Sequence, residues 1–399
     1  MTKLLDLKNN SVIAINQNNY TKEDNYKKVC YLDTDNITNN RINAFLKIDL
    51  TKEKLPSRAK RKCSLNSIIY SSVRPNQRHF GIIKEIPKNF LVSTAFIVID
   101  IIDLEKLDPN YLYYYITQDK ITHYLQRIAE CGTSSYPSIT PLDFLNIKIK
   151  LYPLETQQKI TRTLSILDQK IENNHKINEL LHKILELLYE QYFVRFDFLD
   201  GNNKPYQTSG GKMKFSKELN RLIPSGWSVR FLNHKIVSTY QPKTISKTLL
   251  NDSYSYSVYG GGGIIGRFTE YNHEQSEFII SCRGQCGISY LTLPKSWITG
   301  NAMVIRPTKS YTSKTYLYHT IKKYKLTNYI TGSVQPQITR QNLSTMPILI
   351  PKRKTLNKWN NISSPLWNLI HNNMQSTQTL TALRDFLLPL LLKQQVKPK

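Results

Sequence analysis

A heptad pattern that occurs twice, 199 residues apart, limits the folds open to this chain of 399 residues. Between about Glu155 and Phe193 the sequence has few helix breakers, and side chains at alternating steps of three and four form an apolar seam with a polar middle. The copy near the C-terminus keeps this character at most positions, with Arg384 as the exception. The seam residues are Leu167, Ile171, Asn174, Asn178, Leu181 and Leu188 in the first copy, and Leu366, Ile370, Asn373, Thr377, Leu380 and Leu387 in the second.

A seam of this length must bury its apolar edge, and the nearest partner is the other helix of the same chain. We therefore predict two antiparallel helices that pair as an intramolecular coiled coil, with the asparagines fixing the register. Two alternatives stay open: each helix packs on its own domain, or the seams mediate dimerisation. The pair Ser364–Pro365 is typical of a helix start, which indicates a second helix that begins late or is kinked near its beginning.

The repeat extends upstream of both helices. The stretch SSYPSITPLDF at 134–144 recurs as SVQPQITRQNL at 333–343, and we call these two stretches the exit segments. Each is followed by a short alternating apolar run that ends at proline, which predicts a strand. The residues between the helices are rich in Gly, Asn, Lys and Ser and predict an unpacked connecting arm.

The predicted fold class is α+β, with two mixed α/β domains joined by two long antiparallel helices in a pseudo-twofold arrangement. The predicted parts are a domain at 1–153, a long helix at 154–195, a linker at 196–222, a second domain at 223–352 and a long helix at 353–393.

The charge balance points to a polyanionic partner. The formal net charge is +26 and the pI is about 9.7, so nucleic acid is the first candidate. A membrane surface is the competing interpretation, but the chain has no apolar run of 18 or more residues and no signal peptide. Its five cysteines are odd in number and scattered, which favours a reducing cytoplasm.

The first domain carries two groups of candidate DNA contacts. A basic cluster suits phosphate oxygens, and SSVRPNQRHFG at 71–81 follows a predicted strand, where loop side chains could reach base edges. Arginine pairs with guanine, and asparagine or glutamine with adenine; the alternative is that these are solvated loop residues. The candidates are Arg58, Lys60 and Arg61 in the cluster, and Arg74, Asn76, Gln77 and Arg78 in the loop.

The second domain contains YGGGGIIGRF at 259–268, which formally satisfies GxGxxG. We reject a dinucleotide site because a polar, aromatic segment follows where a helix should begin, and no βαβ unit surrounds it. The glycines instead permit tight turns or close approach of backbone to a ligand. The candidate contacts here are Gly262, Arg267, Arg283, Gln285, Asn301 and Arg340; in the exit segments they are Tyr136, Ser138, Gln335 and Gln337, as junction residues that orient a reading domain.

Signatures of catalysis are missing from the sequence. It has no Walker A, HExxH or GxSxG motif and no Asn- or Asp-Pro-Pro-Tyr, and Cys282 with Cys286 has no second ligand pair for zinc. These absences favour a protein that binds DNA without catalysing a reaction and without its own metal or cofactor. The alternatives are a stand-alone DNA-modifying enzyme with an unrecognised centre and a free bipartite DNA-binding regulator.

Several short motifs, taken in order, resemble the specificity (S) subunit of type I restriction-modification enzymes over essentially the whole chain. They are SYPSITPLDF, LETQQKI, LLYEQYFVRFDF, PYQTSGGKM, IPSGW, YGGGGIIG, WITGNAMVI, SVQPQIT and LRDFLLPLLL. The resemblance implies two target-recognition domains that each read half of a bipartite DNA target, and helices that set the spacer and dock two methyltransferase (M) subunits. It also implies that M binds S-adenosylmethionine to methylate adenine, and that restriction (R) subunits use ATP and Mg²⁺.

The sequence departs from the family pattern in two places. The first domain lacks the IPSGW entry motif, so we expect it to be shortened or to use another entry strand. SSVRPNQRH has no evident counterpart in the second domain, nor YGGGGIIG in the first. These differences favour an asymmetric target with unlike halves.

Overall fold

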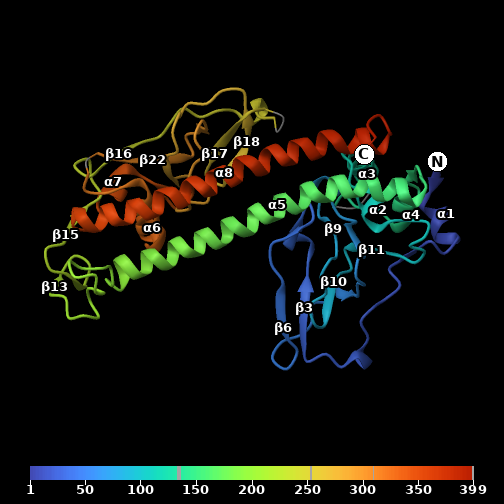
Figure 1. The fold of residues 1–399 in the computed structure, drawn as a ribbon, viewed down its shortest axis with the longest axis horizontal. Helices are drawn as coiled ribbons and strands as arrows, with labels where there is room; N and C mark the ends of the chain where they lie inside the picture. Colours follow the sequence, from blue (N-terminus) through green and yellow to red (C-terminus); the bar gives the residue numbers. More distant parts are fainter. Residues whose placement is uncertain (133–135, 252–253, 309, 398–399) are drawn as a thin grey trace. The chain divides into compact units, whose positions relative to one another are not determined.

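The structure, a computed structural model, describes residues 1–132, 136–251, 254–308 and 310–397, so that Ser134 and Ser135 of the first exit segment lie outside the described residues. The chain forms two compact units. Unit 1 comprises Met1–Glu172 and Thr377–Lys399, and unit 2 comprises Asn173–Ser376. The boundary falls within both long helices, α5 (Leu154–Tyr189) and α8 (Arg353–Leu392), which Figure 1 draws in green and red. Each unit is therefore one mixed domain with one half of each helix.

The two helices pair in both units. In unit 2, the Asn174 carboxamide donates to the carbonyl of Asn373 at 3.5 Å, and that of Asn178 donates to the carbonyl of Ile370 at 3.3 Å. In unit 1, Arg384 forms an ion pair with Asp168 at 2.9 Å. As the residue numbers increase along α5, those of the contacting residues on α8 decrease, so the helices are antiparallel. The predicted fold class, two mixed domains joined by two long antiparallel helices, is confirmed.

Arg384, the one residue that broke the seam pattern, has an acidic partner on the facing helix. Asp168 accepts from its guanidinium and also from the Tyr114 hydroxyl at 2.6 Å. Burial alone would lower the pKa of Arg384, but Asp168 and Asp385 outweigh burial and raise it. The positions of unit 2 that are equivalent by the 199-residue repeat hold Trp367 and Leu185, 5% and 0% exposed. One unit thus uses an ion pair where the other uses apolar packing.

Unit 1 contains two four-stranded sheets. β8 pairs with β9 and β11 antiparallel, whereas β3 pairs with β10 parallel. The first sheet has the order β2 (Ile13–Ile15), β11 (Phe96–Ile101), β8 (Ile68–Ser71), β9 (Phe80–Ile82). The second has the order β6 (Leu46–Asp49), β3 (Lys28–Leu32), β10 (Phe90–Ser93), β7 (Ala59–Arg61).

Unit 2 repeats this topology. β19 pairs with β20 and β22 antiparallel, and β17 pairs with β21 parallel. One sheet has the order β16 (Val237–Tyr240), β22 (Ala302–Pro307), β19 (Phe278–Ser281), β20 (Ser289–Leu291). The other has the order β18 (Gly263–Phe268), β17 (Tyr256–Gly260), β21 (Trp297–Ile298).

The shared topology corrects the expectation that each reading segment lacks a counterpart. SSVRPNQRH lies in the β8–β9 connection, and CRGQCG lies in the equivalent β19–β20 connection. The glycine turn between β17 and β18 corresponds to residues 33–45 between β3 and β6. These pairs were invisible in the sequence because exposed loops of unlike length and composition preserve no residue pattern.

The entry strand and the helices also correspond. β1 (Thr2–Lys3) pairs with β12 (Lys148–Ile149) as β15 (Ser228–Phe231) pairs with β25 (Pro347–Ile350), so the first domain has an entry strand without the IPSGW motif. Asp108 and Ser313 cap the equivalent helices α2 (Pro109–Ile116) and α6 (Lys314–Lys323). Further helices are α1 (Leu4–Asn9), α3 (Asp119–Glu130), α4 (Pro141–Leu145) and α7 (Arg340–Ser344); the remaining strands are β4 (Ile37–Thr38), β5 (Arg41–Ile42), β13 (Met213–Ser216), β14 (Arg221–Pro224), β23 (Ile330–Thr331) and β24 (Gln337–Ile338).

The late start considered for the second helix and the unpacked arm predicted between the two helices both differ from the structure. α8 begins at Arg353 and continues through Pro365, because buried Trp359 and Trp367 on either side hold it against unit 2. The predicted unpacked arm contains the β13–β14 hairpin, and its Phe198 stacks on Trp227 with ring centroids 5.2 Å apart. Aromatic side chains within a polar stretch were enough to anchor it, because each buries a large apolar area.

Buried histidines make the stability of unit 2 sensitive to acid. His319 and His371 are 3% and 6% exposed, and neither Nε2 has a hydrogen-bond partner within the described residues. Burial, with a smaller effect of neighbouring lysines, lowers the pKa of His319 to about 3 and that of His371 to about 4. In the unfolded chain both groups titrate near 6.5. Below pH 6.5 the unfolded state therefore binds more protons, and stability falls as the pH drops toward 4.

We expect the free energy of unfolding of unit 2 to have its highest value above pH 6.5. Below pH 6.5 it should decrease by up to about 1.4 kcal/mol per histidine for each pH unit. All four tryptophans lie in unit 2, so tryptophan fluorescence in urea at pH 7 and pH 5 follows this unit. His319→Gln should flatten the pH dependence, whereas exposed His234→Gln should not. Equal urea midpoints at both pH values would contradict the prediction.

Candidate nucleic-acid interface

The β8–β9 connection in unit 1 presents a short exposed loop. A 3₁₀ turn at Pro75–Gln77 is flanked by Arg74 and Arg78, whose φ angles of 47° and 57° are both left-handed. Such conformations are costly for arginine and are concentrated at functional sites. Arg74, Asn76 and Gln77 are exposed, and Arg78 is half-buried. We call residues 72–79 reading loop 1.

The first exit segment runs beside reading loop 1. The Ile139 N–H donates to the carbonyl of Ser72 at 2.8 Å, and the Arg74 N–H donates to the carbonyl of Pro137 at 2.9 Å. Ser138 forms an isolated bridge with Val73. The Arg74 guanidinium lies over the Tyr136 ring, 5.4 Å from its centroid. The exit segment thus braces the loop that carries the candidate base contacts.

The second exit segment makes the same contact in unit 2. The Ile338 N–H donates to the carbonyl of Cys282 at 3.0 Å, and Gln337 bridges with Arg283. The Cys286 thiol donates to the carbonyl of Pro336 at 3.1 Å. We call residues 282–287 reading loop 2. The recurrence of the exit segment therefore has a structural reason, since each copy braces one reading loop before the chain enters its long helix.

The glycine turn between β17 and β18 packs directly on reading loop 2. A side chain at Gly261 would place its Cβ 2.9 Å from the carbonyl oxygen of Arg283 and 3.8 Å from that of Asn301. Only glycine permits this approach. The structure thereby brings together five exposed candidates of unit 2: Gly262, Arg283, Gln285, Asn301 and Gln337. Two further candidates, Gln335 and Arg340, are also exposed and lie before and after β24.

Four predicted cationic contacts are placed away from the reading loops. Arg58 and Lys60 are exposed at β7, an edge strand of the other sheet. Arg61 turns inward: one guanidinium nitrogen donates to the carbonyl of Thr94 at 3.2 Å, the other two are buried, and burial lowers its pKa. Arg267 donates to the carbonyl of Ser255 at 2.5 Å. Arg61 thus braces backbone and is poorly placed to meet phosphate, whereas Arg267 combines a backbone contact with partial exposure.

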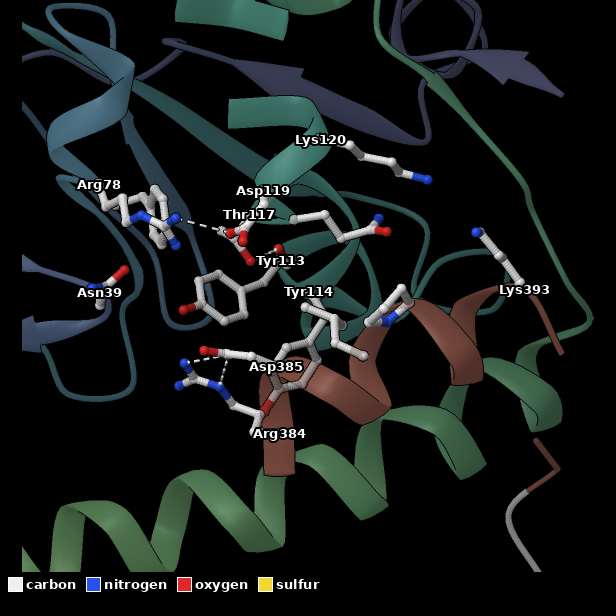
Figure 2. A pocket seen from close by; sticks show the side chains of 14 residues that line it. Asn39, Arg78, Tyr113, Tyr114, Thr117, Asp119, Lys120, Arg384, Asp385 and Lys393 are labelled. Carbon is white, nitrogen blue, oxygen red and sulfur yellow. Dashed lines mark hydrogen bonds and ion pairs between the residues drawn. The ribbon is translucent and has the colours of Figure 1, made fainter. Parts of the chain in front are cut away.

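A cavity of about 330 Å³ borders reading loop 1. Figure 2 shows Arg78 reaching Asp119, with which it forms an ion pair at 2.9 Å, and Asn39 at the same edge. Lys120 and Lys393 also line the cavity, and each is without a carboxylate partner in the described part of the chain. Sequence reasoning did not find Asn39, Lys120 or Lys393, because no local pattern distinguishes them from other exposed polar residues.

The reading loops carry no evident catalytic chemistry. Within the described ranges, no group of three or more His, Cys, Asp or Glu side chains could hold a metal ion. Burial raises the pKa of the Cys282 and Cys286 thiols, which disfavours reactive thiolates. No helix formed by the described residues has the length and apolarity needed to cross a membrane.

The fold and these loops define a class of protein: two recognition domains of one topology, each with a braced, exposed polar loop, on a shared pair of helices. Residues 6–183 and 224–381 match the family described as the type I restriction modification DNA specificity domain, and the chain belongs to this family. The resemblance found in the sequence is confirmed.

Individual relatives are distant but span most of the chain. It is 23% identical over 446 residues to the type I restriction enzyme HindI specificity subunit of Haemophilus influenzae, covering 93% of this chain and 95% of that protein. It is 24% identical over 326 residues to the MjaIX specificity subunit of Methanocaldococcus jannaschii, covering 73% and 70%. A crystal structure of the type I S subunit from M. genitalium has a similar fold, with a TM-score of 0.56, 16% identity and coverage of 98% and 99%.

We expect Gly261→Ala to weaken DNA binding by about tenfold or more, because its Cβ would displace the backbone of Arg283 and with it one base-reading side chain. Gly201→Ala is the matched control, since a Cβ there meets nothing within 4 Å. Fluorescence anisotropy measures binding to a DNA target that is first obtained for the unmodified chain by binding-site selection. An unchanged dissociation constant for Gly261→Ala would show that reading loop 2 is not a DNA contact.

Proposed function

We propose that this chain is the specificity subunit of a type I restriction-modification system and reads an asymmetric bipartite DNA target, one half with each unit. One observation carries the proposal: units of the same topology present unlike loops at the equivalent place. Reading loop 1 offers Arg74, Asn76 and Gln77, whereas reading loop 2 offers Arg283 and Gln285 beside a glycine turn. Different donor and acceptor sets select different base edges, so the half-sites differ.

Charge supports DNA as the partner. The net charge of +26 suits the phosphate backbone, and most candidate side chains of both reading loops are exposed. Phosphate contacts would position each unit, while the loops would select the sequence. Arg58 and Lys60, exposed at β7, suit the first role.

A second apolar stripe on α5 supports the positioning of methyltransferase subunits. Ile177, Leu180, Ile184 and Leu187 recur at steps of three and four and are 43%, 62%, 45% and 59% exposed. They are separate from the seam that faces α8, so α5 has a second face on which another helix could pack. We propose that this stripe docks an M subunit, through which R subunits join the complex.

We propose no catalytic role or cofactor for the chain itself. S-adenosylmethionine would be bound by M, and ATP and Mg²⁺ by R, in the cytoplasm where the DNA lies. Methyl transfer by the purified chain without M would favour the alternative of a stand-alone enzyme. Tight site-specific binding without M would favour a free bipartite regulator.

Binding-site selection with the chain and its M subunit should return two unlike half-sites separated by a spacer of constant length and free sequence. The affinity should fall steeply with salt, because bound phosphates release counterions. Methylome sequencing of a host that carries both subunits provides an independent readout of the same target. Two identical half-sites, or selection of one continuous short site, would contradict the proposal.

Leu180→Asp and Leu187→Asp should each reduce the amount of M that co-purifies with the chain by about tenfold, since an apolar contact of this size contributes about 1.5–3 kcal/mol. Both side chains are more than half exposed, so the fold should persist. Lys247→Asp, at an exposed lysine of unit 2 that lies in the turn Lys247–Leu249 and not on α5, is the control for added negative charge. Undiminished co-purification would exclude the stripe as the M site.

A further inference from the structure

We propose that unit 1 has a second base-reading element, the β4–β5 hairpin at residues 37–42, with Asn39 at its tip contacting a base edge. The inference rests on the proposed DNA-recognition function and extends it to a segment for which the sequence indicated no role. The experiment below separates the failure of the one from the failure of the other.

The hairpin has a tight two-residue turn. Ile37 pairs with Ile42 and Thr38 with Arg41, which leaves Asn39 and Asn40 as the turn. Their φ angles are 48° and 67°, and two successive positive values are what a type I′ turn requires. Asparagine tolerates this conformation better than most residues with a side chain. The sequence thus builds a rigid tip that carries a carboxamide.

The tip is fastened to the end of reading loop 1. The Asn39 N–H donates to the carbonyl of Arg78 at 2.9 Å, and the Asn40 N–H to the carbonyl of Phe80 at 2.8 Å. The Asn40 carboxamide oxygen accepts from the Ile82 N–H at 2.8 Å. The two hairpins therefore form one polar ridge, whose neighbouring backbones are about 5 Å apart. The major groove, which is about 12 Å wide, admits a two-stranded β-ribbon, so the tip of the β4–β5 hairpin is small enough to enter it.

Gly81 makes this fastening possible. A Cβ at this position would lie 2.7 Å from the Ile37 side chain and 2.9 Å from the Asn40 carboxamide oxygen. A larger residue would force the buried Ile37 side chain or the Asn40 carboxamide to shift, which would disturb the contact between the Asn40 carboxamide and the Ile82 N–H. Gly81 is thus a positioning residue whose replacement leaves every proposed base contact chemically intact.

Asn39 has the chemistry of a base reader. It is exposed, and no described residue forms a hydrogen bond with its carboxamide. Figure 2 shows it beside Arg78, at the edge of the cavity that borders reading loop 1. A carboxamide presents one donor and one acceptor side by side, which matches the major-groove edge of adenine. Asn40, in contrast, has its carboxamide occupied by the fastening contact.

The described residues of unit 2 include no comparable side chain at the equivalent turn. The β17–β18 turn consists of Gly261 and Gly262, which present backbone alone. A Cβ at Gly262 would meet nothing within 4 Å, so that side of the turn is open. The hairpin in unit 1 and the bare turn in unit 2 lie in equivalent connections, and each contacts its reading loop: the hairpin near the loop's end at Arg78, the glycine turn near the loop's start at Arg283. This difference gives unit 1 an additional side chain with which to specify its half-site.

The test is binding-site selection with the chain in complex with its methyltransferase, comparing wild type, Asn39→Ala, Gly81→Ala and the control Asn9→Ala, an exposed asparagine on α1. We expect Asn39→Ala to lose about tenfold to hundredfold discrimination at one or two adjacent base pairs of one half-site, with the other half-site unchanged. Gly81→Ala should relax the same positions although Asn39 is intact. Asn9→Ala should select the wild-type target.

The outcomes separate the two hypotheses. If wild type selects a bipartite target and both variants select it with unchanged discrimination, the hairpin inference is overturned and the proposed function stands. A uniform loss of affinity across all sequences would also overturn it, because it would make the hairpin a brace or a phosphate contact. If wild type selects no sequence, the proposed function itself fails. Circular dichroism of each variant confirms that unit 1 is folded.

Discussion

The apolar seam between α5 and α8 is the interaction on which the rest of the structure depends, because it closes both units: unit 1 is assembled from two segments that the whole of unit 2 separates in sequence, and unit 2 begins and ends within the two helices. The core of unit 1 joins Leu4 and Ile160 to Leu391, and the Tyr152 hydroxyl donates to the carbonyl of Leu392 at 3.0 Å. The core of unit 2 includes Leu185 and Ile370. Unit 1 is therefore completed by the half of α8 that the chain reaches only after traversing unit 2, whereas unit 2 is one continuous segment whose two ends are the helix halves that pair. Removing either helix would expose apolar surface in both units.

The side chains in the seam also determine which helix halves pair with each other. Asp168 faces Arg384 in unit 1, while the equivalent positions in unit 2 hold the apolar residues Trp367 and Leu185. Pairing two copies of the first helix with each other would set Asp168 against Leu185 and leave a carboxylate in an apolar contact without its partner. Such an unpaired charge costs several kcal/mol, of the order of 3–5. The break in the repeat thus favours one chain supplying both helices.

Sequence patterns predicted the elements whose residues repeat at a regular spacing. They missed the features that depend on tertiary contacts between residues far apart in the chain. The seam, the exit segments and the fold class follow from heptads and from a repeat of constant offset. The second helix has the predicted start at residue 353, and the late start that Ser364–Pro365 left open does not occur; the arm at 196–222 is packed in part. Burial of Trp359, Trp367 and Phe198 outweighs the local breakers and polarity. Likewise, the inward turn of Arg61 depends on the carbonyl of Thr94, and Arg267 is held by the carbonyl of Ser255; neither carbonyl is close to its arginine in sequence. Composition alone cannot distinguish such braces from exposed contacts.

By itself the sequence determined the family, the duplicated architecture and the positive charge that suits DNA, because these properties follow directly from motif order, periodicity and composition. Only the tertiary structure decided that SSVRPNQRH and CRGQCG occupy equivalent connections, that each exit segment braces one of them, and that Asn39 joins the first. The physical reason is that loops are selected for the surface they present. Their equivalence lies in which strands they connect and which backbone groups they bond, and neither leaves a pattern of residues along the chain.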